Sequence, residues 1–377
     1  MNVWQMRIAN ALEERKQSQG YRVRQVAQDH SDCLNFASND YLGLSHSPEL
    51  IQAWQNGAEL YGVGSGGSSH VTGYHAPLQQ LERRLAEWLG YDRAIVYSSG
   101  FAANQALIQL LIEKNDWIIA DKLSHASLIE AAMNSKGNFK RFAHNDSDSL
   151  RHLLSKVDRD QAVLTVTEGI FSMDGDEAPL NTIQAVIEKN HNHWLIEDDA
   201  HGIGVHGQEG KGTCDRQGIY PDILIVTFGK AFGISGAAIL CSDSMAEYLV
   251  QKSRALIYST AIPPAQAYTL MKSIEVISQS DDKRAYLHSL IRYFKSELKD
   301  LGIENHSNSA IQPIIIGSNE ESLRVAQILK DHHIWALAIR PPTVPPNSAR
   351  IRLTLNANHT QENIDQVIGA LRYAFGR

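Results

Sequence analysis

Short apolar runs alternate with helical patterns along residues 94–241, and this alternation constrains the fold more than any other feature of the sequence. The runs have the length and composition of buried strands. They are Ala94–Ser98, Trp117–Ala120, Ala162–Val166, Trp194–Glu197, Ile223–Thr227 and Ala237–Cys241. Strands that alternate with helices are typical of a mostly parallel sheet with helices on its faces. The sequence therefore predicts an α/β fold.

Helices are predicted by apolar side chains that recur on one face. The clearest helix covers residues 77–89, with Pro77 near its start and Gly90 directly after its end, as is common at helix termini. A second helix is expected over residues 102–113. The N-terminal segment Met1–Lys16 predicts a helix with a polar face and not a signal peptide.

The character of the sequence changes near residue 280, where Ser278–Lys283 is polar. Beyond it, Ile311–Ile316 and Ile351–Leu355 predict strands, and a closing helix is expected to start at Thr360. A chain of 377 residues is long for a single core. We therefore expect an N-terminal segment, a large domain and a smaller C-terminal α+β domain, with the boundaries 1–44, 45–280 and 281–377.

Composition excludes several classes of protein. The chain has 35 basic and 42 acidic residues, which argues against a general affinity for nucleic acid or anionic membranes. A regulator that binds DNA would need a basic DNA-binding module in addition to the domains described above, and we find no such module in the sequence. No apolar run approaches the roughly 20 residues that span a bilayer. Cys33, Cys214 and Cys241 are too widely spaced to suggest a disulfide framework, so a cytoplasmic location is expected.

A lysine lies three residues after one of the predicted strands, at Lys230 in the segment Thr227–Gly233. An ordinary solvated charge is unfavourable at the mouth of a buried strand. A desolvated lysine readily becomes neutral, and the neutral amine is a nucleophile toward carbonyl groups. Lys230 is therefore a candidate for a covalent bond to a carbonyl cofactor.

Two other strand ends carry groups that complement this lysine. Asp198 and His201 follow one strand, and Gly100 and Phe101 open a helix after another. A carboxylate can pair with a protonated pyridine nitrogen, and a helix start attracts phosphate. Thr227 offers a hydroxyl to the same phosphate. Each residue also has a purely structural interpretation, but their order along the chain predicts a pyridoxal-phosphate (PLP) enzyme.

Three further residues are candidates for the same site. His125 begins a helix after a strand, where it can stack on the cofactor ring or simply make a local hydrogen bond. Arg350 and Arg352 point to the same side of a predicted strand. Either guanidinium can bind a substrate carboxylate through two parallel hydrogen bonds.

Histidines near residue 200 raise the alternative of a metal site. They are His191, His193, His201 and His206. Their spacing matches neither HExxH nor a Cys/His zinc motif. The sequence therefore predicts no metal ligands.

Several motifs together resemble the α-oxoamine synthase family, from about residue 5 to the C-terminus. The motifs are residues 35–44, 64–74, 124–127, 167–176, 198–201, 227–230 and 339–345. Members of this family are fold-type I PLP enzymes that condense an amino acid with an acyl thioester and release CO2. The resemblance implies a fold-type I PLP-dependent transferase with PLP as cofactor.

The resemblance also implies roles for individual residues. The implied catalytic residues are Lys230, His125, Asp198 and His201. The implied PLP-binding residues are Gly100, Phe101, His125, Ser172, Asp198, His201, Thr227, Lys230 and Thr260. The implied substrate-binding residues are Arg22, Asn39, Ser68, His125, Thr343 and Arg352, with Arg24 as an alternative to Arg22.

Within the family, the motifs best match enzymes that use L-alanine and a pimeloyl group carried by coenzyme A or acyl carrier protein. In 5-aminolevulinate synthases, which use glycine, threonine typically matches Ser68. The smaller serine leaves room for the methyl of alanine, although one methyl discriminates by only ~1–3 kcal/mol. Glycine-using relatives, including 2-amino-3-ketobutyrate CoA ligase, and serine palmitoyltransferase remain alternatives. The resemblance further implies a homodimer in which Thr260 reaches a phosphate across the interface.

Overall fold

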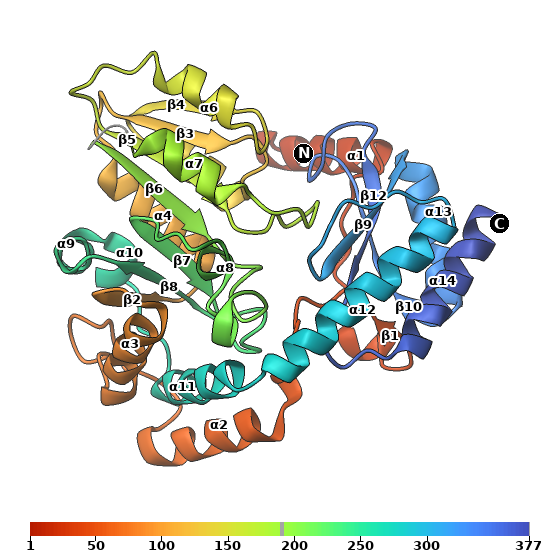
Figure 1. Cartoon of the computed structure of the whole chain (residues 1–377), viewed down its shortest axis with the longest axis horizontal. Coiled ribbons are helices and arrows are strands. Elements are labelled where there is room, and N and C mark those ends of the chain that lie inside the picture. The colour runs from red at the N-terminus through yellow and green to blue at the C-terminus, as the bar shows by residue number, and fades with distance from the viewer. Residues whose placement is uncertain (189–191, 377) are drawn as a thin grey trace. The chain divides into compact units, whose positions relative to one another are not determined.

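The computed structural model describes residues 1–188 and 192–376 of the chain (Figure 1). These residues form two compact units. We call residues 39–172 and 176–286 the large unit, and residues 1–38, 173–175 and 287–377 the small unit. The domain boundaries after residues 44 and 280 stay predictions.

A seven-stranded sheet forms the centre of the large unit, in the order β2-β8-β7-β6-β5-β3-β4. Its strands are β2 (Arg93–Tyr97), β3 (Trp117–Asp121), β4 (Asn138–Phe142), β5 (Val163–Glu168), β6 (His193–Asp198), β7 (Ile223–Thr227) and β8 (Ala237–Cys241). Only β8 runs against its neighbours β2 and β7. The predicted mostly parallel sheet is therefore confirmed. The edge strand β4 was not predicted, because its exposed Lys140 and Arg141 interrupt any apolar run.

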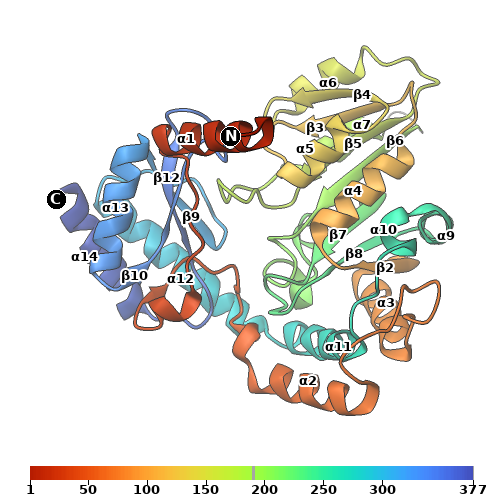
Figure 2. The same ribbon diagram turned by 180° about the vertical axis from the view of Figure 1, so that it is seen from behind.

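Helices cover both faces of this sheet. Figures 1 and 2 show α4 (Gly100–Leu111) and α5 (Ala126–Met133) on one face and α7 (Leu180–Ile187) on the other. The remaining helices are α2 (Pro48–Tyr61), α3 (Ala76–Leu89), α6 (Ser147–Leu154), α8 (Thr213–Gln217), α9 (Asp243–Lys252), α10 (Arg254–Ile257) and α11 (Pro264–Ser278). The predicted end of α3 is confirmed, because Gly90 adopts a left-handed conformation with φ of 78°.

The parallel strands end at one edge of the sheet and place polar residues there. Glu168 at the end of β5 is paired in register with Asp198 at the end of β6. Thr227 is the last residue of the next strand, β7. Ligands of open α/β sheets bind outside the carboxyl ends of the strands. This edge is therefore the expected place for a site.

The small unit is built on a three-stranded antiparallel sheet in the order β11-β12-β9. Its elements include β9 (Ile311–Gly317), β11 (Leu337–Ile339), β12 (Ala349–Thr354), α13 (Asn319–Asp331), α14 (Gln361–Phe375) and the short parallel pair β1 (Leu34–Asn35) and β10 (Ile334–Trp335). The helix α12 (Asp281–Asp300) begins in the large unit and continues into this one. Thr360 caps α14, as predicted, by accepting a hydrogen bond from the N–H of Asn363. The predicted smaller α+β part of the chain is thus confirmed.

The N-terminal helix α1 (Val3–Gln17) is confirmed, and none of its side chains is buried. Asn2 and Gln5 begin it with a reciprocal capping box. Neither α1 nor any other helix in the described part of the chain is long and apolar enough to cross a membrane.

Candidate active site

A cavity of about 340 Å³ lies in the large unit, at the carboxyl edge of the sheet. Its lining includes many of the residues that the sequence assigned to a single site. They are Asn39, Gly100, Phe101, His125, Asp198, His201, Thr227 and Lys230. Residues from the ends of β6 and β7 and from the starts of α4 and α5 therefore meet in one place, while the roles assigned to them stay predictions.

One wall of the cavity is the start of α4. Ser99 caps this helix by accepting a hydrogen bond from the N–H of Ala102, at 3.2 Å. A Cβ atom on Gly100 would lie 2.7 Å from Cγ2 of Thr227, so only glycine lets the helix start approach β7 this closely. The Thr227 hydroxyl oxygen is buried and has no hydrogen-bond partner among residues 1–188 and 192–376. Helix-start N–H groups beside a buried hydroxyl form a site for an anion.

Asp198 is fixed by a buried amide that the sequence analysis missed. Nδ2 of Asn104 donates to Oδ2 of Asp198 at 2.8 Å and to Oγ of Ser127 at 2.9 Å. The N–H of Ala200 donates to the other carboxylate oxygen at 3.1 Å. Asn104 is only 1% exposed. An amide on the same helix face as the buried Leu107 was the signal that could have revealed it.

Tyr41, like Asn104, had no role predicted from the sequence, and it binds His201. The Tyr41 hydroxyl lies 2.5 Å from Nδ1 of His201, and Tyr41 is only 1% exposed. Tyr41 lies within the motif 35–44, but the residues alone gave no reason to place it beside His201. Because Nδ1 is engaged, Nε2 is the nitrogen through which His201 can contact a ligand.

His125 is the N-cap of α5 and lies between charged groups. Burial lowers the pKa of His125; the nearby Asp198 raises it and Lys230 lowers it again. Its backbone N–H donates a short hydrogen bond to Oε1 of Glu168. Burial, and then the charge of Asp198, hold the pKa of Glu168 well above its usual value. Burial therefore favours the neutral forms of His125 and Glu168, the two groups that interact with the charge of Asp198.

Two further carboxyl groups flank Asp198 in the chain. Burial raises the pKa of Asp199 to about 7, although hydrogen bonds from Thr213 lower it. Burial and the charge of Asp199 raise the pKa of Glu197 well above its usual value. Burial therefore favours the protonated forms of both groups, which limits the negative charge beside Asp198.

The two candidate arginines belong to the small unit and have different partners. Nη1 of Arg350 donates to Oδ1 of Asp174 at 2.6 Å and to the carbonyl oxygen of Met173 at 3.2 Å. Nη1 of Arg352 donates to Oγ1 of Thr354 at 2.9 Å. Arg350 is thus committed to an ion pair with a neighbouring segment, which favours Arg352 as the substrate ligand.

Arg22 and Thr343, both predicted to line the acyl channel, meet in the small unit. Nη2 of Arg22 donates to Oγ1 of Thr343 at 3.0 Å, although 321 positions separate them in the chain. The contact favours Arg22 over Arg24 as the channel residue.

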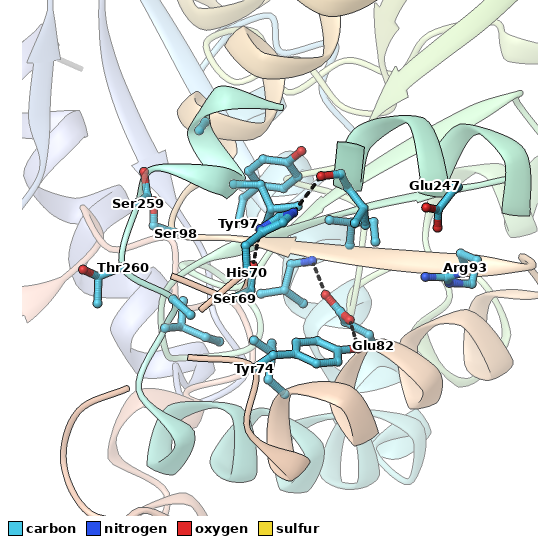
Figure 3. A pocket seen from close by; sticks show the side chains of 18 residues that line it. Ser69, His70, Tyr74, Glu82, Arg93, Tyr97, Ser98, Glu247, Ser259 and Thr260 are labelled. Carbon is cyan, nitrogen blue, oxygen red and sulfur yellow. Dashed lines mark hydrogen bonds between the residues drawn. The ribbon is translucent and has the colours of Figure 1, made fainter. Parts of the chain in front are cut away.

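Thr260 and Ser172 are not among the residues that line the first cavity. Thr260 lines a second cavity of about 210 Å³ in the large unit, together with Ser69, His70 and Tyr74 (Figure 3). Ser68, which directly precedes this group, lines neither cavity. Ser98 borders both cavities. The roles of Thr260, Ser172 and Ser68 stay predictions.

A buried acid forms one wall of this second cavity. The Tyr74 hydroxyl donates to Oε2 of Glu82 at 2.8 Å, and the N–H of Val96 donates to Oε1 at 3.0 Å (Figure 3). Burial raises the pKa of Glu82 to about 7. Glu82 therefore exchanges its proton near neutral pH.

Potential metal ligands lie elsewhere. Within the two described stretches of the chain, one group of three such side chains lies close enough to share an ion, formed by Asp32, Cys33 and His333 in the small unit. The group is largely exposed and includes neither His193 nor His201. His191 lies outside the described residues.

Comparisons with known proteins give the chain its family. The model of class I and II aminotransferases matches residues 31–371. The chain is 53% identical to an 8-amino-7-oxononanoate synthase of Enterobacter sp. (strain 638), over 99% of this chain and 100% of the relative. It is 51% identical to the enzyme of that name from Yersinia pseudotuberculosis serotype O:1b, over 98% of each chain.

Solved structures agree with these relatives. A Sphingomonas wittichii serine palmitoyltransferase superposes with a TM-score of 0.87 at 30% identity, over 91% of this chain and 87% of that one. An 8-amino-7-oxononanoate synthase from Francisella tularensis gives a TM-score of 0.81 at 31% identity, over 92% and 98%. The names of these relatives and solved structures confirm the resemblance found in the sequence motifs. The chain is a member of the class I and II aminotransferase family.

Proposed function

We propose that this protein is an acyltransferase that condenses L-alanine with a pimeloyl thioester. The products are 8-amino-7-oxononanoate, CO2 and the free thiol, and the reaction is a step of biotin biosynthesis. Relatives with 51–53% identity over nearly the whole chain carry the name of this enzyme. The observation that carries the proposal is the cavity in which Lys230, Asp198, His125 and the start of α4 meet.

The residues of this cavity fit PLP, the cofactor of the reaction. The start of α4 and the buried, unpartnered hydroxyl of Thr227 suit its phosphate. Asp198, oriented by Asn104, suits its ring nitrogen. When bound, PLP supplies an aldehyde that reacts with amines and a protonated ring that accepts electrons from the amino-acid Cα.

Lys230 binds the cofactor and moves protons. Its Nζ takes the proton from Cα of alanine and returns one after CO2 has left. His125, whose pKa burial keeps low, packs on the cofactor ring as a neutral imidazole. It also stabilises the oxygen of the thioester carbonyl as charge develops there.

Other residues orient the cofactor. His201 would hold the phenolic oxygen of the cofactor through Nε2, because the Tyr41 hydroxyl binds Nδ1. Ser172 would contact the same oxygen. Asp198 would lie next to the ring nitrogen, oriented by Asn104.

The remaining residues bind the substrates. Arg352 binds the carboxylate of alanine with help from Asn39, since Arg350 is paired with Asp174. Ser68 leaves room for the methyl of alanine. Arg22 and Thr343 line the channel for the pimeloyl chain, whose carrier is coenzyme A or acyl carrier protein.

We further propose that the enzyme is a cytoplasmic homodimer whose active site lies at the interface, where Thr260 contacts a phosphate bound by the partner. Thr260 is exposed, as a contact with a partner subunit requires. The domains of the protomer are the N-terminal segment 1–44, the PLP-binding domain 45–280 and the C-terminal domain 281–377.

Steady-state kinetics of the purified holoenzyme test this function. Alanine, glycine and serine are compared with pimeloyl-CoA and with pimeloyl-acyl carrier protein. We expect kcat/KM for alanine to exceed that for glycine by roughly 10- to 200-fold, the range that one methyl group provides. A preference for glycine would instead indicate a 5-aminolevulinate synthase or a 2-amino-3-ketobutyrate CoA ligase.

A further inference from the structure

His144 bridges two carboxylates in the large unit, outside the residues used above. It lies between β4 and α6, with Nδ1 2.9 Å from Oδ1 of Asp121 and Nε2 2.7 Å from Oδ2 of Asp176. The ring also packs edge-on against Phe171, with centroids 4.4 Å apart and planes at 86°. The two carboxylates that the imidazole bridges come from different segments of the chain.

The first carboxylate holds the turn that leads to His125. Asp121 ends β3 and is fully buried. Its Oδ1 accepts the N–H of Leu123 at 2.8 Å, and its Oδ2 accepts the N–H of Asn145 at 2.9 Å. Its carbonyl oxygen accepts the N–H of Ser124 at 3.1 Å. The position of residues 122–125 therefore depends on the orientation of this side chain.

The second carboxylate belongs to the segment that contains Ser172. Nδ2 of Asn145 donates to Oδ2 of Asp176 at 2.9 Å. The carbonyl oxygen of Asp176 accepts the N–H of Phe171 at 3.0 Å. Phe171, which packs on His144, directly precedes Ser172. The imidazole is thus connected to both loops that carry predicted cofactor contacts.

The charge of His144 suits a bridge of this kind. Burial alone lowers the pKa of His144, but the hydrogen bonds and charges of Asp121 and Asp176 raise it to about 10. The ring therefore stays protonated at neutral pH and donates from both nitrogens. An imidazolium between two carboxylates also offsets the repulsion that they would exert on each other.

We propose that His144 is a positioning residue for the condensation, because it holds the His125 turn through Asp121 and the Ser172 segment through Asp176. This inference rests on the proposed function, since it takes His125 and Ser172 as contacts of the cofactor. His144 itself touches neither substrate nor cofactor in this account. It fixes the distance between two groups that do.

Two substitutions separate the parts of this role. His144→Phe keeps a ring against Phe171 but removes both donors. His144→Gln keeps an amide that donates to one carboxylate at a time. The matched control is His152→Gln, because His152 is an exposed histidine on α6 of the same unit.

Each holoenzyme is examined by the visible circular dichroism of bound PLP, by the PLP dissociation constant, and by kcat and the KM for alanine. We expect His144→Phe to lower kcat by roughly 10- to 100-fold, the size of effect that a small misplacement of reacting groups produces. The KM for alanine should stay within about threefold, since Arg352 lies outside this network. The dichroism should weaken in the order wild type, His144→Gln, His144→Phe, and His152→Gln should match the wild type.

A folded His144→Phe protein with wild-type kcat and wild-type dichroism would overturn the inference, even if its melting temperature were lower. If this variant does not fold, the same measurements on His144→Gln and Asp176→Asn test the inference: wild-type kcat and dichroism in both would overturn it. If the wild type makes no 8-amino-7-oxononanoate, the proposed function fails. The inference is then still decided by the PLP dichroism and affinity, which need no turnover.

Discussion

Nδ2 of Asn104 lies 2.8 Å from Oδ2 of Asp198, and both side chains are buried. The amide comes from the second turn of α4 and the carboxylate from the end of β6. The helix whose start suits a phosphate thus also orients the carboxylate that suits a pyridine nitrogen. One element therefore sets the distance between the two ends of the proposed cofactor site.

Asn104→Ala should weaken PLP binding and catalysis together. A hydrogen bond to a charged group is worth about 1.5–3 kcal/mol, so we expect a loss of roughly 10- to 100-fold in PLP affinity. Titration of the apoenzyme with PLP, followed by visible absorbance, measures this. Gln109→Ala, on the exposed side of the same helix, is the control. Equal affinities for Asn104→Ala and the control would show that Asp198 needs no support from Asn104.

Arg352→Ala should raise the KM for alanine strongly while the absorbance of bound PLP stays unchanged, because the guanidinium binds substrate and not cofactor. Arg350→Ala should mainly lower stability, since it leaves Asp174 without its partner at 2.6 Å. Steady-state kinetics and thermal unfolding of both variants separate these effects. A larger rise in KM for Arg350→Ala would reverse the assignment of the two arginines.

The strands that position the site could be predicted because they are buried on both faces and read as apolar runs. Ile223–Thr227 and Ala237–Cys241 were predicted with the bounds that the structure has. The edge strand β4 could not be found in this way, because one side of it faces solvent and carries charges. A run or periodic pattern of apolar residues reveals a strand only where its side chains are buried, and few side chains of the edge strand β4 are buried.

The candidate site divides in a similar way. Asp198 ends a strand, and Lys230 and Gly100 each come three residues after one. Their positions along the chain therefore reveal their place at one edge of the sheet. Asn104 contacts Asp198, which is 94 positions away in the chain, and Tyr41 contacts His201, which is 160 positions away. No local pattern encodes such contacts, and they emerge only when the elements pack.

Glu82→Gln should change how stability depends on pH. In the folded protein the pKa of Glu82 is about 7, against an ordinary value of 4.5. Between these values the unfolded chain releases the proton and the folded chain keeps it, so the free energy of unfolding falls as pH rises through this window. The loss is roughly 3 kcal/mol for this group.

The amide in Glu82→Gln does not titrate, so the variant should lose less stability than the wild type between pH 5 and pH 8. Urea unfolding at both pH values measures the difference. Glu87→Gln, an exposed substitution on the same helix, should leave the wild-type dependence in place. If Glu82→Gln and wild type lose the same amount, Glu82 does not hold a proton in the folded state.

Ser68→Thr should shift amino-acid preference from alanine toward glycine. The added methyl occupies the space proposed for the methyl of alanine, and overpacking of this kind costs ~1–3 kcal/mol. We expect kcat/KM for alanine to fall roughly 10- to 200-fold and that for glycine to change little. Equal losses for both amino acids would remove Ser68 from the substrate pocket.

The fate of the alanine carboxylate tests the central claim most directly. The holoenzyme is incubated with L-[1-13C]alanine and pimeloyl-CoA, and labelled CO2, free thiol and product are measured by mass spectrometry and thiol titration. We predict one labelled CO2 for each thiol released, an unlabelled 8-amino-7-oxononanoate product, and neither thiol nor CO2 from Lys230→Ala. Label retained in the product, or turnover by Lys230→Ala, would contradict a decarboxylative condensation centred on Lys230.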